Sequence, residues 1–266
     1  MFDTVIEMLS YPFMTRAFLV GSLVALCSAL LGVSLVLKRY SMIGDGLSHV
    51  GFGAMAIAAA MNAAPLTVAI PVVIVAAILL LRISGNAKIK GDAAIALIST
   101  TSLAVGVMVI SLTTGMNTDV YNYMFGSILA MSAEDVKLSL VLSVFVLILF
   151  IVFYHKIFAR ATGVKAGVYN TLIAVLTAVT IVLGMRMMGA LLISSLIIFP
   201  ALTSMRVCRT FKSVIINAAV ISVVCLIAGV TFSYVATTPA GASVVLANLV
   251  MMVLYTVVGA VKNHMR

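Results

Sequence analysis

An acidic and a basic side chain stand four residues apart where the second apolar segment of this chain begins. Asp45 and His49 lie in the stretch Gly44-Asp45-Gly46-Leu47-Ser48-His49. If that stretch is helical, positions i and i+4 share a face, so a carboxylate oxygen and an imidazole nitrogen can reach one point. This pair of ligands suits a transition-metal ion such as Mn²⁺ or Zn²⁺.

Both residues also fit ordinary structural roles. Aspartate is a preferred N-cap residue, so Asp45 could begin a helix. His49 could be a buried histidine that bonds to a backbone carbonyl. Ionisable groups in or at the edge of a membrane span are costly, however, and they mark functional sites. We therefore treat metal binding as the working hypothesis for the pair.

The segments that would hold this pair are expected to span a membrane. Of the 266 residues, 64% are apolar and 9% are charged, whereas a soluble domain carries about 25% charged residues. This composition excludes an ordinary soluble enzyme, a disordered chain and an outer-membrane barrel. The charge-free runs are Ala17–Leu37, Val50–Leu81, Ala93–Thr118, Leu138–Tyr154, Ala166–Met185, Met187–Met205 and Ser213–Val261.

Two of these runs are long enough for two spans each, since about 20 residues cross a bilayer core. Val50–Leu81 is interrupted by Asn62-Ala63-Ala64-Pro65, and Ser213–Val261 by Thr237-Thr238-Pro239-Ala240-Gly241. Proline cannot continue a helix and glycine loosens it, so both interruptions predict tight turns. We expect an all-α polytopic membrane protein with eight or nine transmembrane helices, forming one domain over residues 1–266.

Basic residues predict the orientation of the chain. With the N-terminus outside, 13 of the 16 lysines and arginines fall on the inner side, and Arg16, Lys137 and Arg186 fall outside. This split agrees with the positive-inside rule. The C-terminus is then cytoplasmic. The charges lie in short clusters between apolar runs rather than on one face, so we expect a lipid bilayer and no nucleic acid as partner.

Few other residues offer chemistry. The three cysteines have no metal-type spacing and are expected to serve in packing. The hydroxyls of residues 99–102 could line a passage, but such groups usually bond back to their own helix. No glycine-rich nucleotide loop with its lysine is present, so the chain is expected to be no enzyme, and ATP hydrolysis would belong to a separate subunit.

Three motifs resemble those of one known family. Residues 39–49 are similar to a basic residue followed by G-D-x-L-[SA]-H, and residues 123–129 are similar to Y-L-F-G-x-[IL]-L. Residues 189–201 match G-x-L-L-x-x-A-L-L-x-x-P-A, with Ser195 where alanine is usual. In this order and over nearly the whole chain, they resemble the integral-membrane permease of bacterial ATP-binding-cassette (ABC) importers for zinc, manganese and iron.

The resemblance implies a type II ABC-importer-like permease in the bacterial plasma (inner) membrane. It implies a homodimer with a pore along its axis, cytoplasmic ABC ATPase subunits and an extracytoplasmic metal-binding protein. The divalent ion (Mn²⁺, Zn²⁺ or Fe²⁺) is then the cargo, and no cofactor is bound permanently. Carried over to this sequence, the motif makes Asp45 and His49 the metal-coordinating pair.

One segment departs from the pattern of this family. An acidic F-D-E-E-[FY]-A segment usually stands in the inner loop before the sixth span, where the ATPase docks. Here the loop His155–Gly163 is shorter and carries no acidic residue. Either the docking helix has been rebuilt with basic residues, or coupling is weakened, or the loop is a natural variant that still docks.

Three other functions remain open from the sequence. A permease for a chelated metal or a cobalamin-like cofactor would need a roomier pathway without the Asp45–His49 pair. A proton-coupled secondary metal carrier would need no ATPase. An intramembrane metalloprotease would carry an H-E-x-x-H signature, which is absent.

Overall fold

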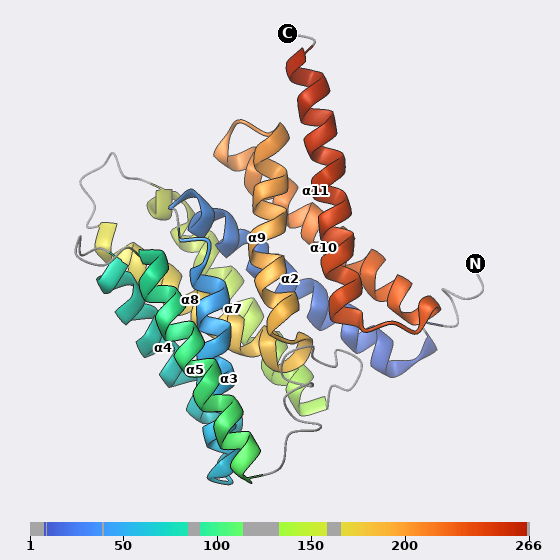
Figure 1. The fold of residues 1–266 in the computed structure, drawn as a ribbon. Coiled ribbons are helices and arrows are strands. Elements are labelled where there is room, and N and C mark those ends of the chain that lie inside the picture. Colours follow the sequence, from blue (N-terminus) through green and yellow to red (C-terminus); the bar gives the residue numbers. More distant parts are fainter. Residues whose placement is uncertain are drawn as a thin grey trace.

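Long apolar helices make up most of the described structure (Figure 1). The computed structural model describes residues 8, 10–38, 40–84, 91–113, 133–158 and 166–264. Nine helices in this part of the chain are long and apolar enough to cross a membrane, which agrees with the expectation of eight or nine spans. They are α2 (Pro12–Leu37), α3 (Ile43–Ala60), α4 (Pro65–Ser84), α5 (Gly91–Thr113), α7 (Ala133–Phe158), α8 (Ala166–Met188), α9 (Ala190–Val207), α10 (Phe211–Ala236) and α11 (Ala240–His264).

Both predicted turns are confirmed. Residues 61–64 join α3 to α4, and Asn62 adopts a positive φ of 53° within that turn. Residues 237–239 join α10 to α11, and Thr237 ends α10 in the left-handed conformation. In each turn a proline follows the positive-φ residue: Pro65 is the first residue of α4, where its fixed φ suits the first helical turn, and Pro239 directly precedes α11.

The break between α8 and α9 lies at Gly189, three residues after Arg186, where the charge-free run Ala166–Met185 has just ended. Arg186 lies in the last turn of α8, and Gly189 alone separates the two helices. Its φ of 88° and ψ of 157° belong to a backbone region that is almost confined to glycine. Gly189 thus lets the chain leave α8 and start α9 within one residue.

Burial divides the helices into an inner and an outer group. In the most apolar stretch of α2 and of α3, 72% of the residues are buried, and the share is 61% in α8 and α9. The share falls to 22% in α4 and α7 and to 17% in α11. The outer helices therefore expose apolar side chains such as Leu79, Ile151 and Leu254, as helices facing lipid do.

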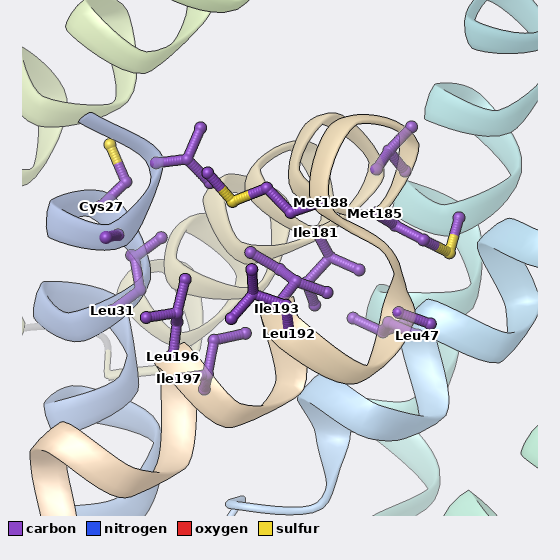
Figure 2. Close-up of a cluster of buried hydrophobic side chains, with 14 of the residues drawn as sticks. Cys27, Leu31, Leu47, Ile181, Met185, Met188, Leu192, Ile193, Leu196 and Ile197 are labelled. Atoms are coloured by element: carbon purple, nitrogen blue, oxygen red, sulfur yellow. The ribbon is translucent and has the colours of Figure 1, made fainter. Parts of the chain in front are cut away.

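The inner core is built against one face of α9 (Figure 2). Leu192 and Leu196 of α9 are buried in one cluster with Leu31 of α2 and Met185 of α8. Lipid tails are as apolar as leucine, so such helices associate through close packing rather than through escape from water. Gly32 of α2 illustrates this, because a Cβ there would overlap the carbonyl oxygen of Ile197 in α9.

Close packing also fixes α3 against α5. A Cβ on Gly106 of α5 would lie 3.0 Å from the Cα of Gly53 in α3, and one on Gly53 would lie 2.7 Å from the carbonyl oxygen of Ser102. Small residues on both helices allow this backbone approach. α3 is thereby held between α5 on one side and the inner helices on the other.

Candidate metal site

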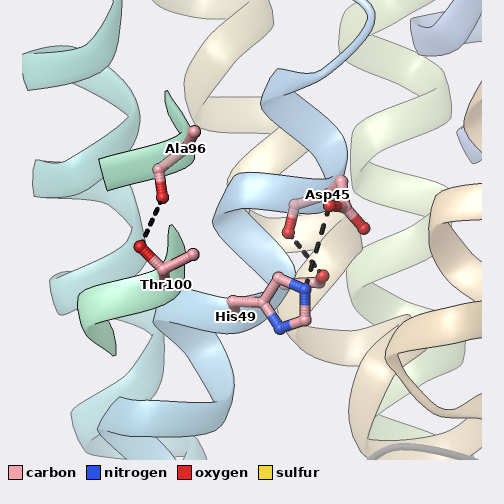
Figure 3. A network of polar contacts seen from close by, with 5 residues as sticks. Asp45, His49, Ala96 and Thr100 are labelled. Carbon is pink, nitrogen blue, oxygen red and sulfur yellow. Dashed lines mark hydrogen bonds and ion pairs between the residues drawn. The ribbon is translucent and has the colours of Figure 1, made fainter. Parts of the chain in front are cut away.

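Asp45 and His49 lie on one face of α3, in its first two turns. The helix begins at Ile43 rather than at Val50, where the charge-free run begins. The Nε2 atom of His49 lies 3.8 Å from Oδ2 of Asp45 (Figure 3). Two ligands that each lie about 2.1 Å from one ion are at most about 4.2 Å apart. The pair is therefore close enough to share an ion.

Neither structural alternative for the pair is found in the described residues. The N-cap of α3 is Met42, and Asp45 lies inside the first turn. His49 forms its ion-pair contact with Asp45, and no hydrogen bond joins its ring to a backbone carbonyl in the described part of the chain. The N-cap and buried-histidine interpretations are therefore wrong. A carboxylate in the first turn interacts favourably with the helix N-terminus.

The pair opens into a cleft of about 350 Å³. The cleft is lined by Asp45 and His49 of α3, by Val245 of α11, and by six residues of α9: Ala190, Leu191, Ser194, Ser195, Ile198 and Phe199. The Asp45 side chain is 44% exposed and that of His49 is 20% exposed. Six water molecules at about 30 Å³ each fill about 180 Å³, so a divalent ion fits with its first hydration shell.

The cleft lies beside the middle of a spanning helix. A Cβ on Gly44, the neighbour of Asp45, would lie 3.1 Å from the side chain of Ile197. Ile197 is near the centre of the 18-residue helix α9, about 10 Å from its start at 1.5 Å per residue. A carboxylate and an imidazole at the level of mid-helix are costly to hold in a membrane, which favours a functional role.

Within the described residues, this pair is the donor set that one chain offers at the cleft. No group of three or more His, Cys, Asp or Glu side chains that could hold a metal is found among the described residues. Cys27 and Cys225 are buried, as their packing role predicts, and Cys208 is partly buried. In α5, Thr100 donates to the carbonyl oxygen of Ala96 at 2.8 Å, so this hydroxyl bonds back to its own helix (Figure 3).

Two sequence features lie wholly or partly outside the described residues. The motif at residues 123–129 falls within the undescribed range 114–132. The inner loop that departs from the family pattern is described only as far as the end of α7 at Phe158. The interpretation of that loop stays a prediction.

Sequence comparison shows which family contains this fold and site. Residues 10–259 match the ABC 3 transport family. The chain belongs to this family. The matched residues include all or most of each of the nine described helices. The family match and these apolar helices together show that the chain is a multi-pass membrane protein of a transport system.

Curated relatives of this ABC 3 chain include two metal transport proteins. The manganese transport system membrane protein MntC of Halalkalibacterium halodurans is 27% identical over 248 residues, which cover 90% of this chain and 85% of the relative. The high-affinity zinc uptake system membrane protein ZnuB of Haemophilus influenzae is 30% identical over 246 residues, which cover 90% of this chain and 94% of the relative.

A solved structure shares the fold of this ABC 3 chain. It is PsaBC from Streptococcus pneumoniae in complex with Fab, with a TM-score of 0.84 and 25% identity. The match covers 95% of this chain and 94% of the other chain. The helical arrangement in Figure 1 is therefore one already seen in a solved structure rather than a new fold.

Proposed function

We propose that this chain is the membrane permease of an ABC importer for a divalent transition-metal ion (Mn²⁺, Zn²⁺ or Fe²⁺), and that Asp45 and His49 bind the ion in transit. One observation carries the proposal: a carboxylate and an imidazole 3.8 Å apart open into a cleft beside the middle of α9. The transport of manganese and zinc by family relatives supports this choice of cargo.

A second copy of the chain is proposed to complete the coordination of the ion. Zn²⁺ takes four ligands and Mn²⁺ takes about six, whereas Asp45 and His49 supply two. A twofold axis repeats every residue of an interface on both copies. If the axis passes beside the cleft, two carboxylates and two imidazoles face one ion, and water completes its shell.

The energy for import is assigned to separate cytoplasmic ATPase subunits. The described residues form transmembrane helices and short connections, which leave no place for a nucleotide-binding domain in that part of the chain. Membership of an ABC family favours ATP over a proton gradient as the energy source. An extracytoplasmic metal-binding protein would deliver the ion, and the bacterial plasma membrane would hold the assembly.

In the proposed transport cycle, Asp45 and His49 bind the ion in one conformation of the permease and release it in another. The carboxylate of Asp45 and the imidazole of His49 replace part of the hydration shell of the ion when the cleft is open to the outside. Closure of the ATPases on ATP changes the packing of the inner helices, which carry both ligands. A small number of ligands keeps binding weak enough for the ion to leave on the inner side.

The size of the cleft argues against a larger cargo. Its 350 Å³ lies at the low end of the range for pockets that hold drug-sized molecules, about 300–1,000 Å³. A cobalamin-like cofactor exceeds that range, whereas a partly hydrated ion fits. The size of the cleft therefore favours a partly hydrated ion over a cobalamin-like cofactor.

Uptake by the reconstituted complex tests the proposal. The chain, its ATPase and its binding protein are placed in proteoliposomes, and the entry of Mn²⁺, Zn²⁺ and Fe²⁺ is followed with and without ATP. We expect ATP-dependent entry of at least one ion, with loss of that entry in Asp45→Ala. Uptake that is independent of ATP, or equal in the variant, would contradict the proposal.

A further inference from the structure

Ser194 and Ser195 occupy the middle of the cleft wall formed by α9. Residues four apart on a helix form rows, and two neighbouring rows of α9 line the cleft: Ala190, Ser194 and Ile198, and Leu191, Ser195 and Phe199. In each row the serine stands between two apolar residues. Ser194 and Ser195 are thus the polar residues that α9 contributes to the same cleft as Asp45 and His49.

Both hydroxyls are buried, and neither has a hydrogen-bond partner among the described residues. Ser194 is 9% exposed and Ser195 is 5% exposed. Some buried hydroxyls elsewhere bond to a carbonyl one turn earlier, as Thr177 does with Ile173 at 2.7 Å, whereas those of Ser34, Thr203 and Ser204 also have no partner among the described residues. A buried hydroxyl without a partner is costly. This cost is offset when a ligand in the cleft supplies the missing partner.

We propose that Ser194 and Ser195 are specificity-determining residues, whose hydroxyls favour Mn²⁺ over Zn²⁺ in the cleft. This inference rests on the proposed function of the chain as a metal permease. Mn²⁺ suits octahedral, oxygen-rich coordination, whereas Zn²⁺ is satisfied by four nitrogen, sulfur or carboxylate ligands. Hydroxyl oxygens, or waters that they hold, extend the shell beyond Asp45 and His49 toward six ligands.

A competition experiment on the complex in proteoliposomes tests this inference. The ratio of ATP-dependent Mn²⁺ uptake to Zn²⁺ uptake is measured from an equimolar mixture. In the Ser194→Ala/Ser195→Ala double variant we expect the ratio to fall about two- to tenfold, the range that one hydrogen-bonding group gives. In Ser195→Cys the softer sulfur should lower the ratio further in favour of Zn²⁺.

Ser204→Ala is the matched control. Ser204 lies on the same helix, is fully buried and also has a hydroxyl without a partner among the described residues, but it does not line the cleft. We expect its Mn²⁺/Zn²⁺ ratio to equal that of the native chain. An equal fall in Ser204→Ala and in the double variant would overturn the proposal, because the effect would then come from α9 packing.

Failure of this inference differs from failure of the proposed function. An unchanged ratio in an active double variant overturns the role of the serines and leaves the permease function intact. A native chain that takes up none of Mn²⁺, Zn²⁺ and Fe²⁺ with ATP refutes the permease function itself, whereas uptake of Fe²⁺ alone overturns only this inference. If the double variant does not assemble with its ATPase, Ser195→Cys decides alone, and an unchanged ratio there overturns the inference.

Discussion

At the residue scale, the pairing of Asp45 with His49 depends on where α3 begins. The helix starts at Ile43 and includes Gly44 and Gly46, although glycine disfavours helix by about 1 kcal/mol per residue. A Cβ on Gly46 would lie 2.7 Å from the side chain of Ile95 in α5. The packing that needs glycine thus overrides the local preference against helix, and it brings the two ligands onto one face.

We expect Asp45 and His49 to act as a unit. Asp45→Asn and His49→Gln each keep the size of the side chain but weaken it as a metal ligand. Residues that bind one ion are not additive, so the double variant should bind the metal no more weakly than the worse single variant. Metal affinity of the purified complex, measured by isothermal titration calorimetry, checks this.

Asp92→Asn is the control for that series. Asp92 is exposed in the first turn of α5 and does not line the cleft, so the metal affinity of Asp92→Asn should match the native value. If the losses of metal-binding free energy in Asp45→Asn and His49→Gln add in full in the double variant, the two residues bind the metal independently.

The sequence predicts the Asp45–His49 pair but not the two serines of the cleft. Ionisable residues are rare in this chain, so their positions attract attention. Ser194 and Ser195 sit in an apolar run where hydroxyls usually bond back to their helix. Only the placement of α9 against α3 shows that their rows line the cleft.

At the element scale, α8 and α9 depend on Gly189 for their junction. The charge pattern predicts a span end near Arg186, because a charged residue normally ends an apolar span. Arg186 lies in the last turn of α8, where a long side chain can reach the interface from inside the helix. The position of the break depends on a positive φ, which charge and hydropathy do not reveal.

Gly189→Ala should destabilise the protein. Backbone conformations reserved for glycine cost other residues about 1–3 kcal/mol, and Gly189 has φ 88° and ψ 157°. We expect a lower midpoint of thermal unfolding in detergent. Gly167→Ala is the control, since a Cβ at Gly167 in α8 meets nothing within 4 Å. Equal midpoints for both variants would show that the junction tolerates a side chain.

Pairs of helix ends show how the elements alternate in direction. Lys38, after the end of α2, donates to Asn170 near the start of α8 at 2.6 Å. At the opposite end of α8, Ser139 near the start of α7 donates to the sulfur of Met187 at 2.8 Å. Each contact joins two residues that the predicted orientation puts on the same side of the membrane.

At the scale of the whole molecule, the orientation of the chain is a prediction that labelling can check. The turn between α3 and α4 should face the outside, and the connection between α9 and α10 the cytoplasm. In a Cys208→Ser background, a membrane-impermeant maleimide should label Met61→Cys in intact cells, because Met61 is 72% exposed.

Arg209→Cys is the counterpart on the other side. Arg209 is exposed in the connection before α10, and it should react only after the cells are opened. Labelling of Arg209→Cys and not of Met61→Cys in intact cells would reverse the orientation.

The proposed shared ion predicts how mixed dimers behave. Complexes with one native and one Asp45→Ala copy can be isolated with two different affinity tags. If both copies bind one ion, the mixed complex should bind metal at least about tenfold more weakly than the native one, since loss of one ligand costs about 1.4 kcal/mol or more. Half the number of sites at native affinity would show instead that each copy binds its own ion.

The number of spans could be predicted from sequence, but their arrangement only in part. Length and composition define a span, and the nine described helices agree with the predicted count. The least apolar of them, α3 with a mean hydropathy of 1.2, is internal, and the most apolar, α7 at 2.9, is outer. Yet α2 is internal at 2.4. Its place depends on Gly32 and the close approach to α9, which hydropathy does not report.

The metal content of cells tests the central claim most directly. Cells that express the chain with its ATPase and binding protein are compared, by elemental mass spectrometry, with cells that carry Asp45→Ala at equal expression. We predict that one of Mn²⁺, Zn²⁺ or Fe²⁺ accumulates with the native chain and stays at background with the variant. Equal metal contents in the two strains would contradict the assignment of Asp45 and His49 to a metal import pathway.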